Sequence, residues 1–226
     1  MRSVVLLSGG MDSATLLGRV LQSGAGDDTV NAISFRYGQR HEKEIHAASD
    51  LCAHYDLPHE VIDVALPRAG SVLMTDKAMP QMSYEELQAA EGPSPTYVPF
   101  RNGTFLSLAA AYALDLGADT LHTAVHADDG HNWAYPDCTP EFVGAMQNAI
   151  YVGTYHEVRL QAPFVYLTKA EIVALGTLLR VPFDLTWSCY EGREFACGTC
   201  PTCVSRLEAF DQAGLKDPIP YERTPA

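Results

Sequence analysis

The chain has 226 residues and a formal net charge of −13, from 28 acidic and 15 basic side chains. This length suits one α/β domain with a modest extension, and the acidic balance argues against a nucleic-acid-binding face, which needs clustered Lys and Arg. No apolar run approaches the roughly 20 residues of a membrane-spanning helix, and the N-terminus leads straight into a strand pattern, so we expect a cytoplasmic protein without a signal peptide.

The first predicted elements are a buried strand over 4–7, a tight turn and a helix over 14–21. The turn carries the motif Ser8-Gly9-Gly10-Met11-Asp12-Ser13, whose glycines let the backbone approach a ligand closely. N–H groups at a helix start favour phosphate, and the two serines add hydroxyl donors. Asp12 fits beside phosphates if it holds Mg²⁺ between them. The motif lacks the Walker Gly-Lys-Ser/Thr, and its strand–turn–helix context favours a phosphate loop over an ordinary glycine turn.

A second strand is predicted over 29–35, followed by a turn with three candidate nucleotide ligands: Arg36, Tyr37 and Arg40. Ligands of α/β sheets bind beyond the carboxyl ends of strands, where this turn falls. The arginines would face a triphosphate and the tyrosine would stack near adenine. The alternative is a solvated turn in which the arginines pair with Glu42 and Glu44.

After a helix over 42–54 and a third strand over 59–64, residues 65–95 lose clear periodicity. We expect a functional lid or mobile loop there, with a helical turn at 83–90. Its methionines are interpreted as gap-fillers: Met74, Met79 and Met82.

An apolar helix is predicted over 104–116, capped by Asn102 or Thr104. Arg101 lies at the start of this helix, where a cation is unfavourable unless an anion is also present. This position predicts that Arg101 contacts a substrate or a phosphate.

A fourth strand over 119–125 leads into a polar loop and the turn Tyr135-Pro136-Asp137. Asp137 is placed to read the N–H edge of a ligand, although a role as helix cap for 140–150 is nearly as well supported. Three side chains of this loop have metal-ligand chemistry, but a plain polar loop is the favoured interpretation: His126, Asp128 and His131. A fifth strand over 157–161 precedes Thr168–Glu171, which fits a capping box, and Lys169 at that helix start would suit a phosphate.

The last cluster is Cys189-x7-Cys197-x2-Cys200-x2-Cys203. Four thiolates at this spacing predict a closed, structural Zn²⁺ site, with an iron–sulfur cluster as the alternative. Five strands alternating with helices predict a doubly wound, mostly parallel α/β sheet. We therefore divide the chain into an ATP-binding domain over 1–184 and a zinc-binding extension over 185–226.

Together these segments resemble the 7-cyano-7-deazaguanine synthase (QueC) family of the PP-loop ATP pyrophosphatases. The matching motifs follow in chain order: SGGMDS (8–13), YGQRHEKE (37–44), YVPFRNGTFLSLAA (97–110), YPDCTPEF (135–142), LTKAEIV (167–173), TWSCYEG (186–192) and CGTCPTC (197–203). The resemblance implies an enzyme, often a homodimer, that uses ATP, Mg²⁺ and ammonia to turn 7-carboxy-7-deazaguanine into its nitrile through an acyl-adenylate and an amide.

The resemblance also implies roles for single residues. Asp12, Arg101 and Lys169 would be catalytic. Residues 8–13, Arg36, Tyr37 and Arg40 would bind the nucleotide. The substrate would contact five residues: Tyr97, Arg101, Asn102, Phe105 and Asp137.

Two features depart from the family pattern beside the proposed base pocket: the segment 125–134 and Thr139. They leave open a relative that stops at the amide or joins the activated acid to another amine, including one on a protein. A non-catalytic nucleotide-binding adaptor is a further alternative, which Asp12 and Lys169 argue against.

Overall fold

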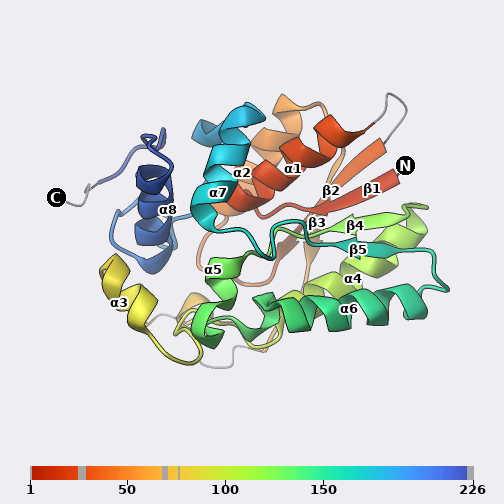
Figure 1. The fold of residues 1–226 in the computed structure, drawn as a ribbon, viewed down its shortest axis with the longest axis horizontal. Helices are drawn as coiled ribbons and strands as arrows, with labels where there is room; N and C mark the ends of the chain where they lie inside the picture. The colour runs from red at the N-terminus through yellow and green to blue at the C-terminus, as the bar shows by residue number, and fades with distance from the viewer. Residues whose placement is uncertain (1, 25–28, 68–70, 76, 223–226) are drawn as a thin grey trace.

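A computed structural model describes residues 2–24, 29–67, 71–75 and 77–222 as a five-stranded parallel sheet with helices on both faces (Figure 1). The strand order is β3-β2-β1-β4-β5, so the order reverses between β1 and β4. This confirms the predicted doubly wound α/β class. The strands are β1 (Arg2–Leu6), β2 (Thr29–Arg36), β3 (His59–Asp63), β4 (Thr120–His122) and β5 (Arg159–Gln161).

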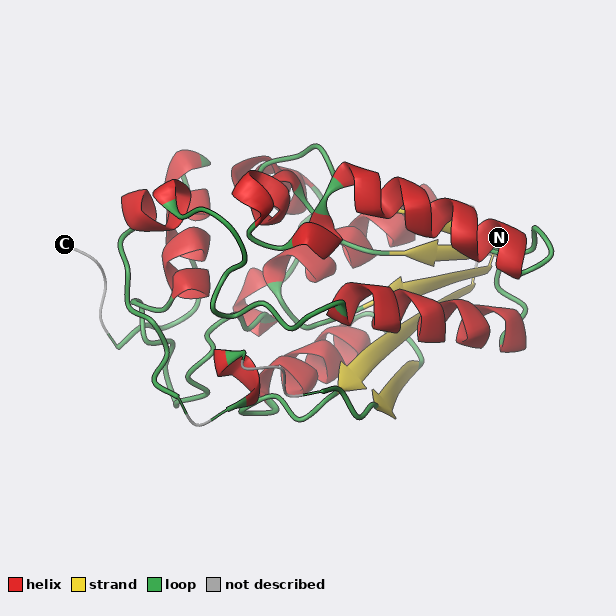
Figure 2. Cartoon of the chain, turned by 90° about the horizontal axis from the view of Figure 1, so that it is seen from below, coloured by secondary structure: helices red, strands yellow, loops and turns green. Residues whose placement is uncertain are grey.

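Alternating side chains of the sheet divide the apolar core into two layers. Val5 packs with one cluster and Val4 with the other, because successive residues of a strand face opposite sides. Helices α1 (Met11–Ser23), α2 (Lys43–His54) and α7 (Lys169–Leu178) cover the first face. Helices α4 (Arg101–Asp115) and α6 (Pro140–Gly153) cover the second, as the view along the sheet shows (Figure 2).

Helix α4 begins three residues earlier than predicted, and the expected caps are wrong. Phe100 takes the N-cap position with φ of 56° and no side-chain cap, so Asn102 and Thr104 lie inside the helix. Asp137 Oδ2 accepts a hydrogen bond from the Asn102 N–H at 2.9 Å. The free N–H groups of a helix start need acceptors, and here one comes from a segment 35 residues away.

The 65–95 region contains η1 (Val72–Met74) and α3 (Tyr84–Ala89), and Ser83 with Glu86 forms a capping box at the start of α3. Residues 68–70 and 76 of the predicted loop lie outside the described residues. Met74 and Met79 are buried against the cysteine cluster, as expected of gap-fillers. Short helices complete the order: α5 (Ala127–Gly130), η2 (His131–Trp133), η3 (Pro136–Cys138) and η4 (Phe183–Leu185).

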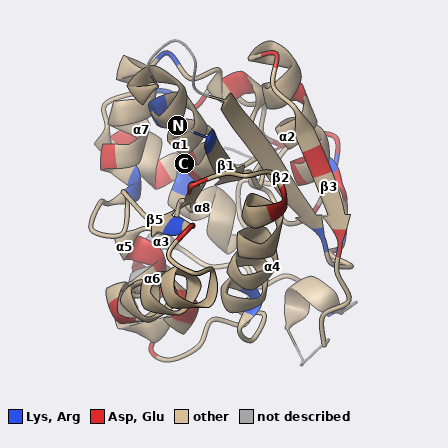
Figure 3. Cartoon of the chain, turned by 90° about the vertical axis from the view of Figure 1, so that its right-hand side faces the viewer, with Lys and Arg blue, Asp and Glu red and all other residues tan. Residues whose placement is uncertain are grey.

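The C-terminal segment lies beyond the carboxyl ends of the strands, with α8 (Pro201–Gln212) beside α7 (Figure 1). Ala209 and Phe210 pack into the same cluster as α1 and α7, so this segment shares the main core. The division at residue 184 stays a prediction. Over the described part of the chain, no helix combines the length and apolarity needed to cross a bilayer. Lys and Arg are scattered, rather than gathered on one face, in the view of Figure 3.

Candidate active site

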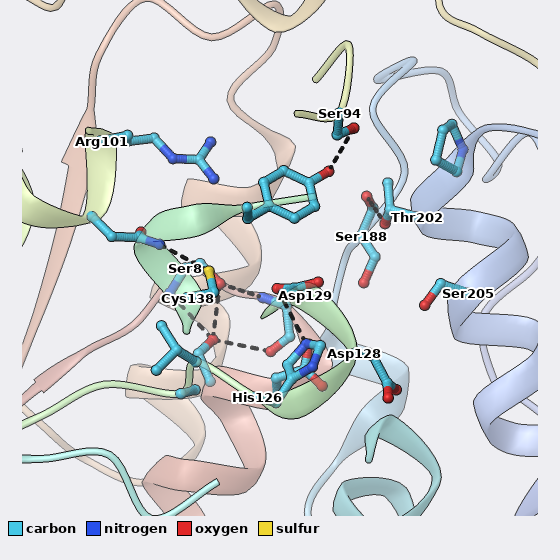
Figure 4. Close-up of a pocket in the computed structure, with 18 of the residues that line it drawn as sticks. Ser8, Ser94, Arg101, His126, Asp128, Asp129, Cys138, Ser188, Thr202 and Ser205 are labelled. Atoms are coloured by element: carbon cyan, nitrogen blue, oxygen red, sulfur yellow. Dashed lines mark hydrogen bonds and ion pairs between the residues drawn. The ribbon is translucent and has the colours of Figure 1, made fainter. Parts of the chain in front are cut away.

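A cavity of about 540 Å³ opens at the carboxyl edge of the sheet, where the strand order reverses. Open α/β sheets bind ligands at such switch points because the loops after the two central strands diverge there. Figure 4 shows Arg101 and His126 directed toward this space, with Ser188, Thr202 and Ser205 from the C-terminal segment on the opposite wall. The cavity is therefore built from both halves of the chain.

The predicted phosphate loop forms one wall of the cavity. Gly9 has φ of +85°, and a Cβ on it would meet the Glu44 carbonyl oxygen at 2.0 Å, so only glycine fits. The Ser8 and Ser13 hydroxyls lie 3.0 Å apart, and Ser8 Oγ accepts from the Gly10 N–H at 3.2 Å. These bonds hold the turn in shape before α1 begins at Met11. The Met11 side chain is buried in the core, so only its backbone can serve a ligand.

Asp12 lies beside a lysine and a histidine. Its Oδ2 is 3.8 Å from Lys169 Nζ and 3.6 Å from His126 Nε2. Burial alone would raise the Asp12 pKa, but Lys169 and His126 outweigh it and hold the pKa at about 2. The buried Oδ1 has no hydrogen-bond partner among the described residues. Asp12 is thus an ionised carboxylate with one oxygen left for a cation, which fits a divalent metal between phosphates.

His126 is a residue of the site that the sequence interpretation did not favour. It is 1 % exposed, its Nε2 lies 3.3 Å from Asp129 Oδ2, and neither ring nitrogen has a hydrogen-bond partner within the described chain. Asp128 Oδ2 instead accepts the Lys169 backbone N–H at 2.8 Å, which attaches α5 to the start of α7. The position of His126 just after a central strand was the signal available in the sequence.

A second wall carries Arg101 and aromatic rings. Arg101 Nη1 donates to Tyr37 Oη at 3.0 Å, and both side chains line the cavity. Phe105 also lines it and stacks on Phe35 with ring centroids 4.3 Å apart. Asn102 reaches the same space. The structure therefore brings together Arg101, Tyr37, Asn102 and Phe105.

Five other predicted ligands do not line this cavity: Gly9, Arg36, Arg40, Tyr97 and Asp137. Arg36 pairs with Glu42 at 2.6 Å and with Asp63 at 2.9 Å, close to the alternative of a solvated, paired turn. Tyr97 Oη accepts from the Phe100 N–H at 3.0 Å, and Asp137 accepts from Asn102. Tyr97 and Asp137 thus shape the turn before α4, Arg36 shapes the turn after β2, and Arg40 is exposed.

The four C-terminal cysteines converge as predicted. All are buried, and their sulfur atoms lie within 4.8 Å of one another. Cys197 Sγ and Cys203 Sγ are 3.9 Å apart, close to the edge of about 3.8 Å that a tetrahedron with Zn–S bonds of about 2.3 Å requires. Backbone N–H groups of Thr199 and Cys200 point at Cys197 Sγ, which favours a thiolate. Within the described residues this is the one group of three or more His, Cys, Asp or Glu ligand atoms that comes together. The donor set fits a bound metal.

The less favoured alternative, a second metal group in the loop after β4, is not formed among the described residues. His126, Asp128 and His131 do not bring their ligand atoms together among the described residues. Their separate contacts agree with a polar loop.

The fold and the site define a nucleotide-binding α/β protein of the PP-loop class, with its glycine loop after the first strand and a metal-binding cysteine cluster near the C-terminus. The chain belongs to the QueC family: the family model described as "Queuosine biosynthesis protein QueC" matches residues 2–214.

Relatives named 7-cyano-7-deazaguanine synthase match almost end to end. The protein of Caldicellulosiruptor bescii is 45% identical over 98% of this chain and 98% of its own length. That of Methanoregula boonei is 42% identical, over 98% and 100%. Among solved structures, the U34-tRNA thiolase NcsA from Methanococcus maripaludis has a TM-score of 0.54 at 14% identity, covering 93% of this chain and 64% of that chain. At that identity the likeness concerns the fold alone.

Proposed function

We propose that this chain converts 7-carboxy-7-deazaguanine to 7-cyano-7-deazaguanine, using ammonia and two ATP and releasing AMP and pyrophosphate twice. The carrying observation is the near-complete match to relatives of that name at 41–45% identity. The cavity supports it, because an ATP-type phosphate loop and a cationic, aromatic wall face the same space. Nothing in the chain favours the alternative of a different amine acceptor.

The phosphate loop would hold the β,γ-pyrophosphate. Residues 8–13 supply N–H and hydroxyl groups, and Lys169 supplies charge beside Asp12. The free oxygen of Asp12 would bind Mg²⁺, which neutralises phosphate charge and orients the α-phosphorus for attack.

The acid group of the substrate must reach the α-phosphorus. Arg101 would orient that carboxylate, whose oxygen forms the new P–O bond as pyrophosphate leaves. Ammonia then attacks the acyl carbon, AMP leaves, and a proton is lost to give the amide. The amide oxygen then attacks the α-phosphorus of a second ATP, and pyrophosphate leaves. Loss of AMP and of the two remaining N–H protons gives the nitrile. No side chain need act as nucleophile, since ATP supplies the leaving group.

The wild-type assay tests this proposal directly. Incubation with ATP, Mg²⁺, ammonium and the carboxylic acid should release two AMP for each nitrile, with product identified by mass. A mass gain on a protein amine would instead support the ligase alternative. Absence of AMP would support a nucleotide-binding adaptor. The homodimer and the cytoplasmic location stay predictions.

The cysteine cluster is proposed to hold Zn²⁺ with no open position, which gives it a structural role. We expect one zinc ion per chain by elemental analysis, and Cys200→Ser should lose it and lower the thermal midpoint, because the metal ties α8 to the 189–197 loop. Cys52→Ala, outside the cluster, should keep zinc. Iron with visible absorbance, in place of zinc, would contradict this assignment and favour an iron–sulfur cluster.

A further inference from the structure

Helix α2 contributes Glu44 to the five carboxylates that line the cavity, beside Asp12, Glu91, Asp128 and Asp129. Glu44 is in the first turn of α2, and its side chain lines the cavity. Its carbonyl oxygen fills the space in which a Cβ on Gly9 would sit, so the start of α2 is packed directly against the phosphate loop. The Glu44 side chain is therefore held at a set position relative to that loop.

The Glu44 carboxylate has no hydrogen bond or ion pair with any described residue. Desolvation by the cavity walls raises its pKa, the charge of Arg101 opposes that rise, and the charge of Cys189 adds to it. Glu44 is half-buried, and a partly desolvated carboxylate that faces a cavity without donors from the protein points to a ligand that supplies them. A role in stabilising the helix dipole alone would not require a position inside the cavity.

The residues around Glu44 indicate which kind of ligand would bind there. Tyr37 and Tyr190 line the same cavity; burial is the largest cause of their raised pKa, and the charge of Glu44 adds to both. Arg101 donates to Tyr37 Oη from the same region. This end of the cavity thus presents a hydrogen-bond acceptor beside a strong donor, between aromatic rings.

A guanine-like ring carries the complementary pattern. Its N1–H and 2-amino groups are adjacent donors, which a carboxylate accepts with both oxygens. Its 6-oxo group lies between N1 and the 7-substituent, so one guanidinium can reach both the 6-oxo oxygen and a 7-carboxylate. Asp137, the residue predicted to read this edge, is 3 % exposed, accepts from Asn102 and does not line the cavity.

We propose that Glu44 binds the N1–H and 2-amino donors of the deazaguanine ring and selects for the 2-amino group, with Arg101 on the 6-oxo and 7-carboxylate side. This assignment rests on the proposed function, and it identifies Glu44 as the residue that determines specificity for the substrate ring. It places the ring at a set distance from the phosphate loop, because the α2 backbone that carries Glu44 contacts Gly9.

The test compares 7-carboxy-7-deazaguanine with its analogue lacking the 2-amino group. Wild type should bind the amino compound about 100-fold more tightly, as expected for hydrogen bonds to a charged acceptor. Glu44→Gln should raise the KM of the amino compound about 100-fold and leave the KM of ATP within about 3-fold. Glu44→Asp should keep a preference for the amino compound.

Asp50→Asn is the matched control, since Asp50 is exposed on the same helix. Urea midpoints should match among all variants. Unchanged selectivity in Glu44→Gln overturns the assignment. A fall in kcat alone would indicate proton transfer, and a raised KM for ammonium alone would indicate amine binding; either result also overturns it. If wild type consumes no ATP with the acid, the proposed function fails and this assignment falls with it.

Discussion

Asp12→Asn is expected to reduce AMP release by about 1,000-fold or more, the scale of losing a main electrostatic group at a transition state. The substitution keeps the shape of the side chain but removes the charge that pairs with Lys169 and would hold Mg²⁺. With a pKa of about 2, Asp12 is ionised throughout the assay range, so raising or lowering pH between about 5 and 8 should not reproduce the loss.

Labelled ATP with product separation measures this effect. Zinc content should not change, because the cysteines are separate from Asp12 in the described structure. Asp115→Asn, at an exposed position at the end of α4, should retain full activity. An Asp12→Asn protein that releases AMP at near the wild-type rate would remove the phosphate loop from the mechanism.

Arg206→Met is expected to lower the free energy of unfolding by about 3–5 kcal/mol, the usual cost of leaving one partner of a buried ion pair alone. Arg206 and Asp217 are 1 % and 2 % exposed at the side chain, with Nε 2.7 Å from Oδ2 and Nη2 2.9 Å from Oδ1. Arg206 Nη1 also donates to Thr186 Oγ1 at 2.8 Å. These bonds join α8 to Thr186 and to the segment after α8 that carries Asp217.

Urea unfolding followed by tryptophan fluorescence measures the loss. Lys216→Met, at an exposed position beside Asp217, should change stability little. The double variant Arg206→Met with Asp217→Leu should recover part of the loss, since no charge is then left buried. Equal stability of Arg206→Met and wild type would show that the pair does not hold the C-terminal segment in place.

Sequence patterns predicted the structure correctly where the interacting residues lie close together in the chain. Thr168 and Glu171 form the capping box with reciprocal bonds, because both partners lie within one helical turn. The cysteines converge because their spacing already allows a tetrahedron. The helix over 104–116 was found from its apolar period, but its first turn was not, since its acceptor is the distant Asp137.

Residues that face the cavity from separate elements were harder to predict. His126 was assigned to a polar loop and Glu44 to a helix in which it could pair with the arginines of the preceding turn. Nothing nearby in sequence shows that Asp12 neighbours His126 or that Glu44 and Arg101 share a cavity. Conversely, Arg36 and Asp137 had suitable chemistry, yet Glu42 pairs with the first and the Asn102 N–H occupies the second. Side-chain direction depends on how helices dock on the sheet, which composition does not encode.

The sequence by itself determined the α/β class, the phosphate loop after the first strand and the four-cysteine cluster, because each depends on residues close together in the chain. Only the tertiary structure decided which carboxylates face the cavity and which cap helices. That choice follows from strand order and helix packing, which bring residues 12, 44, 101, 126 and 169 to one space.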